Sequence, residues 1–297
     1  MNVYRLLSMV FRAACLCSAG LLLACVANNA GNAGDTGTGS GAASEKSAPA
    51  TEMTTTEDEE ERRSKAVATR VQAGVEALKA RDPERARRHI SRALELDSSS
   101  AEAHNAMGLL YRYEGDDKRE EEHYRKALRA DGKFSQARNN YATLLYKQGR
   151  YRDAIEQLEK AADDTSYPQR ALAFLNLGRC YVRVEEYDKA SAALQRSLRL
   201  DSTQAEAPLE LADVLLIQKK YADARAYFSV YMSRARHTAR SLWTGIRLES
   251  AMGDTDKVVS YEFQMEKMFK GTPEYAAWQA WKAGAPAADT GTRKKKH

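Results

Sequence analysis

The chain has 297 residues and a formal net charge of +5. Its excess positive charge lies at the two ends, because residues 1–24 contain Arg5 and Arg12 without any acidic residue and residues 293–296 read Arg-Lys-Lys-Lys. Subtracting these two groups of basic residues from +5 leaves −1. The long middle part therefore lacks the basic surface on which nucleic-acid binding depends, and we expect no nucleic-acid partner.

The first 24 residues are typical of an export signal. Two arginines are followed by a 12-residue apolar and small stretch, residues 13–24, which is too short to span a bilayer permanently. It leads into the sequence LLAC, residues 22–25, which resembles the lipobox of bacterial lipoproteins, whose cysteine is acylated. We therefore expect a signal peptide over 1–24 and a lipid anchor on Cys25. A cleaved signal with a chance cysteine, or a translation start at Met9, are the open alternatives.

Residues 25–63 are predicted to be the lipidated cysteine followed by a disordered tether. From Val26 to about Thr56 the sequence is rich in Gly, Ala, Ser, Thr and Asn and has too few apolar side chains to build a core. An acidic run from Glu57 to Glu61 then predicts a solvated lead into the first helix.

A period of about 34 residues runs through the middle of the chain, which is the length of a tetratricopeptide helix pair. A small residue that lets two helices approach closely recurs in this register at Gly74, Gly108, Ala142, Gly178 and Ala212. We predict an all-α tetratricopeptide solenoid of about six repeats over residues 64–283. The expected repeats are 67–100, 101–134, 135–168, 171–204 and 205–238, with a divergent pair over 239–272 and a capping helix over 273–283.

The end of the repeat region has its own signals. Pro273 stands where the first residue of a helix is expected, and Trp278 and Trp281 predict a hydrophobic lid over the last repeat. Residues 284–297 are expected to form a disordered basic tail.

The sequence offers no residues for catalysis. No glycine-rich phosphate loop occurs, and the five histidines have no metal-ligand spacing. Cys180 falls in the middle of a first helix, where a small buried residue is expected. We therefore predict a binding scaffold and no enzyme, with no cofactor, metal or small-molecule substrate.

One repeat position departs from the pattern. Glu120 replaces a small residue and opens an acidic run with Glu121 and Glu122. We interpret this run as a solvated helix face, and the alternatives are an outward tilt of the helix or an exposed acidic patch.

A groove along the first helices is the candidate partner-binding surface. In a stack of such pairs, positions 2, 5, 9 and 12 of each first helix point into the concave face. The residues chosen from these positions are Asn105, Leu109, Arg112, Asn139, Thr143, Tyr146, Leu175, Arg179, Val182, Leu209, Asp213 and Leu216. The asparagines would bond a peptide backbone and the leucines would hold its apolar side chains. The alternative is that the leucines only pack between adjacent repeats.

Short segments near the end of the chain carry a family resemblance. They are LWTGIR at 242–247, AMGD at 251–254 and PEY at 273–275, together with NNYA at 139–142. With the exported N-terminus and the repeats, they resemble the type IV pilus biogenesis lipoprotein family called PilF or PilW, over about residues 60–282.

The resemblance implies an outer-membrane lipoprotein that acts as a pilotin. Such a protein binds the pore-forming secretin subunit and promotes its outer-membrane localisation and multimerisation. Val26 follows Cys25 where an Asp would signal inner-membrane retention, which favours the periplasmic face of the outer membrane. A tetratricopeptide adaptor lipoprotein for outer-membrane protein assembly or cell-wall synthesis, and a soluble intracellular adaptor, remain the alternatives.

Overall fold

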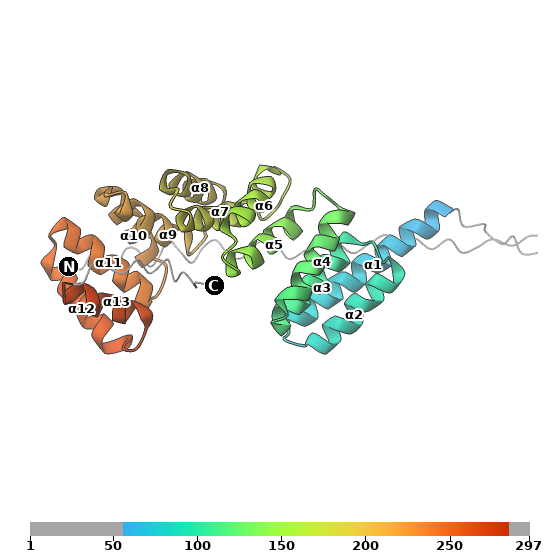
Figure 1. Ribbon diagram of the computed structural model, residues 1–297, viewed down its shortest axis with the longest axis horizontal. Helices are drawn as coiled ribbons and strands as arrows, with labels where there is room; N and C mark the ends of the chain where they lie inside the picture. Colours follow the sequence, from blue (N-terminus) through green and yellow to red (C-terminus); the bar gives the residue numbers. More distant parts are fainter. Residues whose placement is uncertain (1–55, 285–297) are drawn as a thin grey trace, which may run out of the picture. The chain divides into compact units, whose positions relative to one another are not determined.

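The computed structural model describes residues 56–284 (Figure 1), so the predictions made for residues 1–55 and 285–297 lie outside the described part. Within that part the chain forms thirteen α-helices and no strand, which confirms the all-α prediction. The helices are α1 (Thr56–Lys79), α2 (Pro83–Leu96), α3 (Ala101–Glu114), α4 (Asp117–Ala130), α5 (Ser135–Lys147), α6 (Tyr151–Asp163), α7 (Arg170–Arg183), α8 (Tyr187–Leu200), α9 (Ala207–Ile217), α10 (Tyr221–Met232), α11 (Ala239–Met252), α12 (Thr255–Met268) and α13 (Pro273–Lys282).

Successive helices pack against each other in pairs, from α1 with α2 to α11 with α12 (Figure 1). Each first helix also contacts the first helix of the next pair, so that α1, α3, α5, α7, α9 and α11 follow one another along one face. This is the arrangement of tetratricopeptide repeats, in which neighbouring pairs bury what one pair leaves exposed. The six pairs keep the register that the 34-residue period predicts.

Glycine permits the close approach of the two helices in a pair. A Cβ atom added at Gly74 would lie 2.5 Å from Cγ1 of Ile90, and one added at Gly108 would lie 2.5 Å from Cε1 of Tyr124. Both of these large side chains are fully buried. Any larger residue would therefore push the helices apart, since packed interiors tolerate little added volume.

Several helix ends are capped by side chains or by glycine. The side chain of Asp82 accepts a 2.9 Å hydrogen bond from the backbone of Arg85, and Pro83 follows it in the first turn. Gly115 ends α3 in the left-handed region with φ 78°. At the last helix, Thr272 caps α13 by accepting from the backbone of Tyr275. Such caps satisfy the backbone groups that a helix end leaves free.

The last pair is closed by α13. Trp278 is buried against the side chains of α11 and α12, and its Nε1 donates a 3.0 Å hydrogen bond to Glu262. Trp281 meets Trp243 edge to face with ring centroids 5.8 Å apart. The predicted lid is therefore present, and it gives the final repeat a partner for its apolar face.

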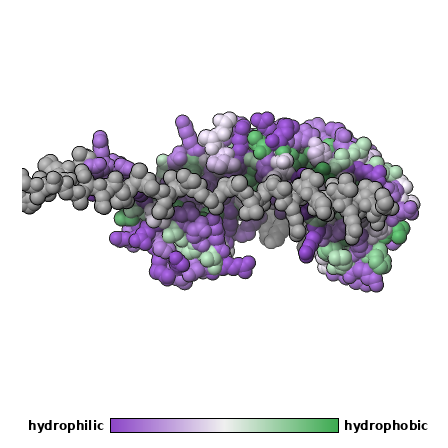
Figure 2. Space-filling model, turned by 180° about the vertical axis from the view of Figure 1, so that it is seen from behind, coloured by the Kyte–Doolittle hydropathy of each residue, from purple (hydrophilic) through white to green (hydrophobic). Residues whose placement is uncertain are grey.

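Hydrophilic surface predominates on the face shown in Figure 2, outside its grey atoms, and the hydrophobic areas there are small. No helix between residues 56 and 284 is long and apolar enough to cross a membrane.

The tether prediction is wrong for its last residues. α1 begins at Thr56, so residues 56–63 are helical and do not belong to a tether. Three acidic residues in the first turn favour this start, because carboxylates stabilise the positive end of a helix. The Arg63 side chain also donates to the carbonyl oxygen of Leu96 at the end of α2, which holds the extension against the first pair.

Candidate functional site

The asparagines predicted for the groove connect neighbouring first helices. Nδ2 of Asn140 donates a 2.9 Å bond to Oδ1 of Asn105, and Nδ2 of Asn176 donates a 3.0 Å bond to Oδ1 of Asn139. Asn105 and Asn139 are 5% and 4% exposed. Their amide oxygens thus accept bonds inside the protein, and the structure gives these side chains a role in stacking repeats.

Glu120 is buried, contrary to the prediction of a solvated acidic face. It is 1% exposed, and Nε of Arg112 donates to its Oε1 at 2.7 Å. Arg112 also donates to the backbone oxygen of Asn140 in the next repeat. Burial raises the pKa of the Glu120 carboxyl, and the bond from Arg112 opposes that rise. The groove residue Arg112 therefore holds an internal acid.

The leucines of the predicted groove divide into two groups. Leu175 and Leu209 are 4% and 5% exposed and belong to the main hydrophobic core. The alternative, that they pack between repeats, is therefore right for these two, and we remove them from the predicted groove surface. Leu109 and Leu216 are half-buried, and Thr143 is exposed.

Four predicted groove residues do meet at one hollow, which we call the C-terminal cleft. It has a volume of about 460 Å³ and lies on the first helices α5, α7, α9 and α11 and the start of α13. The cleft is lined by Tyr146, Arg179, Val182, Arg183, Glu210, Asp213, Val214, Ile217, Arg240, Trp243, Arg247 and Glu274. Of these, Tyr146, Arg179, Val182 and Asp213 were predicted from the sequence.

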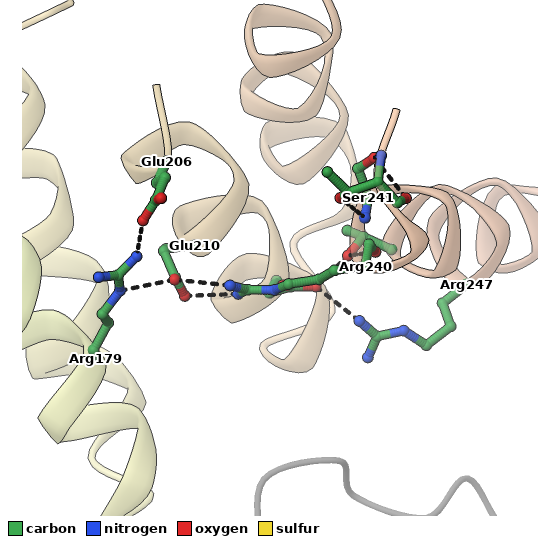
Figure 3. Close-up of polar contacts among 9 residues, drawn as sticks. Arg179, Glu206, Glu210, Arg240, Ser241 and Arg247 are labelled. Atoms are coloured by element: carbon green, nitrogen blue, oxygen red, sulfur yellow. Dashed lines mark hydrogen bonds and ion pairs between the residues drawn. The ribbon is translucent and has the colours of Figure 1, made fainter. Parts of the chain in front are cut away.

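A chain of ion pairs crosses the cleft (Figure 3). Glu210 accepts from Nε of Arg179 at 2.9 Å and from both terminal nitrogens of Arg240 at 2.8 and 2.7 Å. Arg240 also pairs with Asp213 at 2.9 Å, and Asp213 accepts a 2.7 Å bond from Arg247. The Arg179 guanidinium bonds Glu206 as well. The network therefore joins α7, α9 and α11, three successive first helices.

Three members of this network, Arg179, Glu210 and Arg240, have pKa values shifted in favour of their charged forms. Burial alone would raise the pKa of Glu210, but the bonds from Arg240 and Arg179 outweigh it and leave that pKa below its usual value. Burial likewise opposes the charged form of Arg179 and Arg240, and their bonds to carboxylates raise both pKa values nonetheless.

Two arginines of the cleft lie against aromatic rings. The Arg183 guanidinium is 4.9 Å from the centre of the Tyr151 ring and donates a 2.6 Å bond to its hydroxyl oxygen. The Arg247 guanidinium is 5.3 Å from the centre of the Trp243 ring. Stacking of this kind fixes the plane of a guanidinium and the direction of its donors.

Sequence reasoning missed several lining residues, although a signal was present. Positions 2, 5 and 9 of the sixth repeat are Arg240, Trp243 and Arg247, all in the cleft. The rule for groove positions, extended from the fifth to the sixth repeat, selects these three residues. Glu210 and Arg183 occupy positions 6 and 13, one residue away from the rule, and required the structure.

Cys180 is a core residue, as predicted. It is buried, and burial raises its thiol pKa to about 12, so that the thiol stays protonated. Among residues 56–284, no cluster of His, Cys, Asp and Glu side chains has a metal-binding arrangement.

Comparison with known proteins defines the family. Tetratricopeptide repeat models match residues 71–133, 134–203 and 176–236. The type IV pilus assembly protein PilF of Pseudomonas aeruginosa is 36% identical over 212 residues, which are 71% of this chain and 84% of that protein. The chain belongs to the PilF/PilW family of type IV pilus assembly proteins.

Solved structures of this family have the same fold. That of Pseudomonas aeruginosa PilF matches with a TM-score of 0.69 and 36% identity, covering 74% of this chain and 99% of the other. The structure of PilW, described as a widely conserved type IV pilus biogenesis factor, matches with a TM-score of 0.64 and 26% identity, covering 72% of this chain and 98% of the other. Membership in the PilF/PilW family supports a role in type IV pilus biogenesis.

Proposed function

We propose that this protein is a pilotin. In this proposal it is an outer-membrane lipoprotein, anchored on the periplasmic face through Cys25, that binds the type IV pilus secretin and promotes its localisation and multimerisation. The observation that carries the proposal is the 36% identity to PilF over 212 residues.

The architecture suits a scaffold of this kind. First helices from successive repeats share one face, and that face contains a charged and aromatic cleft built from five helices. Surfaces of repeat proteins commonly bind extended or helical segments of a partner. Lipid chains on Cys25 would supply the membrane attachment.

The function is tested by deleting the gene that encodes this protein in the bacterium from which it comes. We expect the secretin monomer to remain and the secretin multimer of the outer-membrane fraction to be lost, with recovery when the full chain is restored. The measurement is immunoblotting of fractionated membranes, accompanied by a pull-down of the secretin from envelope extracts. An unchanged multimer, together with recovery of an outer-membrane protein assembly or cell-wall component as the main partner, would replace the pilotin proposal with the alternative adaptor.

The anchor is tested separately with Cys25→Ser. Loss of the acyl chains should abolish fatty-acid incorporation and release the protein from the membrane fraction, because anchoring by acyl chains does not depend on the repeats. Cys180→Ser is the matched control. The Cys180 thiol is buried in the core, so this substitution should leave fatty-acid labelling intact. Unchanged membrane partition of Cys25→Ser would contradict the lipoprotein proposal.

A further inference from the structure

The C-terminal cleft contains hydrogen-bond donors that the protein does not use. Within the described residues, Arg183 makes one side-chain hydrogen bond, from Nη2 to Tyr151, and Arg247 makes one, from Nη2 to Asp213. A guanidinium has five N–H donors. The Nε atoms of both arginines are shielded from solvent and have no partner. Because these Nε atoms are shielded, an acceptor from outside would meet the terminal nitrogens, and neither Nη1 atom bonds a residue within 56–284.

Two carboxylates of the cleft, Glu210 and Asp213, are already engaged by other arginines. Glu210 is bonded by Arg179 and Arg240, and Asp213 is bonded by Arg240 and Arg247. Their oxygens are therefore shared among three arginines, while Arg183 has no ion pair within residues 56–284. The free binding capacity of the cleft lies on its guanidinium groups.

The shape and charge of the cleft select the kind of acceptor. Each of these two guanidinium groups lies near an aromatic ring, that of Tyr151 for Arg183 and that of Trp243 for Arg247, and the planar fork of a guanidinium matches the two oxygens of a carboxylate. Glu274 also lines the cleft, so a densely anionic strand is repelled there. Val182 and Ile217, which is 43% exposed, add apolar lining that suits the carbon atoms of a peptide.

We propose that the C-terminal cleft binds an acidic peptide segment of a partner protein, through Arg183 and Arg247. Each guanidinium pairs with a carboxylate of the segment, and the aromatic rings hold the guanidinium planes. The inference rests on the proposed function in one respect, namely that a pilotin presents a peptide-binding face. It adds the chemistry of the ligand and the two residues that recognise it.

The experiment uses a displayed library of short random peptides. Peptides are selected for binding to the purified full-length protein. We expect the peptides retained by the wild-type protein to be enriched in Asp and Glu. The enrichment should disappear on the double variant Arg183→Gln with Arg247→Gln. For one selected peptide, fluorescence polarisation should show affinity lower by about tenfold or more when its acidic residues are replaced by amides, and a similar loss on the double variant.

Controls separate recognition from folding. Arg152→Gln changes an arginine on α6 whose side chain is 77% exposed, and it should leave peptide affinity unchanged. If the double variant melts early, Arg183→Gln alone serves, because among residues 56–284 the Arg183 side chain bonds Tyr151 alone. Arg183→Lys keeps the charge without the planar fork and should bind more weakly than the wild type.

Several results would overturn the inference. Selection of no peptide, selection without acidic enrichment, or equal affinity of the double variant would each do so. Binding to phosphatidylglycerol vesicles that the double variant loses would reassign the cleft to a lipid surface. Because the assay contains no secretin, failure here leaves the pilotin proposal standing, and loss of secretin multimers tests that proposal alone.

Discussion

Amide hydrogen bonds join the first helices from α3 to α7, whereas ion pairs join them from α7 to α11. We call the region from α3 to α7 the amide half and the region from α7 to α11 the ionic half. The change occurs at one repeat position, the sixth, which is Asn140 in α5, Asn176 in α7 and Glu210 in α9. Each of these side chains bonds a residue on the preceding first helix, namely Asn105, Asn139 and Arg179.

The difference shows how the same repeat geometry gives an uncharged contact in one region and a charged surface in the other. In each asparagine pair, one amide N–H bonds the other amide oxygen, and the contact contains no charge. A buried carboxylate at the same position needs cations, and Glu210 has one arginine from each side. Those arginines bring further donors to the cleft. The charged surface therefore arises from Glu210 at the sixth position together with the arginines that neighbouring first helices place around it.

The largest expected effect is at the point where the two kinds of contact meet. A Cβ atom at Gly178 would lie 2.6 Å from Cγ of Leu194 and 3.3 Å from the backbone oxygen of Ala190. Gly178→Leu should therefore lower the free energy of unfolding by about 3 kcal/mol through overpacking. Both halves should lose stability, because repeats share it through their interfaces.

Thermal melting followed by circular dichroism measures this effect. Gly132→Ala is the control, since a Cβ there meets nothing closer than 3.8 Å. A melting temperature that does not move in Gly178→Leu would mean that the repeat register is wrong.

The ionic half is tested by Arg240→Ala. This change removes one partner from Glu210 and one from Asp213, and Glu210 is 8% exposed. We expect a loss of about 2 kcal/mol, below the usual cost of breaking a buried pair, because Arg179 and Arg247 remain and Arg240 is partly exposed. Urea unfolding checks the value. An equal loss in Arg152→Ala, whose side chain is 77% exposed, would argue against the network.

A histidine contact should make the amide half sensitive to acid. Nδ1 of His104 and Nδ1 of His123 are 3.1 Å apart. Burial, and then the charge of His104, lower the pKa of His123 from 6.5 to about 4, and burial lowers the pKa of His104 as well. As the pH falls, these two histidines therefore take up protons in the unfolded chain before they do so in the folded protein. Stability should be constant above a pH of about 6.5 and fall as the pH decreases from there to about 4.

The expected loss over that range is about 1 to 2 kcal/mol, after allowance for the partial exposure of the rings. Urea unfolding at a series of pH values measures it, and His123→Gln should flatten the profile. A variant that follows the wild-type pH dependence would show that other groups cause it.

The smallest effect is expected from a single amide pair. Asn140→Ala removes the 2.9 Å bond to Asn105 and should cost about 1 kcal/mol. Gln136→Ala, an exposed change on the same helix α5, should have no measurable effect. If Asn140→Ala costs as much as Arg240→Ala, the contrast between the two kinds of contact does not hold.

The fold was largely predictable because it depends on local rules. Glycines at the period, Asp82 with Pro83 and Thr272 with Pro273 each have a meaning within a few residues of sequence. The site was only partly predictable. Burial of Glu120 depends on Arg112 eight positions earlier on a packed helix, and an acidic run gives no sign of that contact.

Leu175 and Leu209 show the same limit from the other side. Their position in the repeat fits the groove rule, but each is covered by neighbouring repeats. How deeply a helix face is covered depends on the angle between adjacent pairs, which the hydrophobic period does not encode. Of the charged residues predicted at the same face, Arg179 and Asp213 reach the cleft, whereas Arg112 bonds the buried Glu120.

The closing helix gives the chain a built-in optical probe. The sequence has three tryptophans, and Trp243, Trp278 and Trp281 all belong to the packing of α13 on the last pair. Their fluorescence emission therefore reports on the C-terminal end of the repeat array, whereas the ellipticity measured by far-UV circular dichroism reports on every helix. Loss of the two signals at different denaturant concentrations would reveal stepwise unravelling of the repeats, and coincident loss would show that the array unfolds as one cooperative unit.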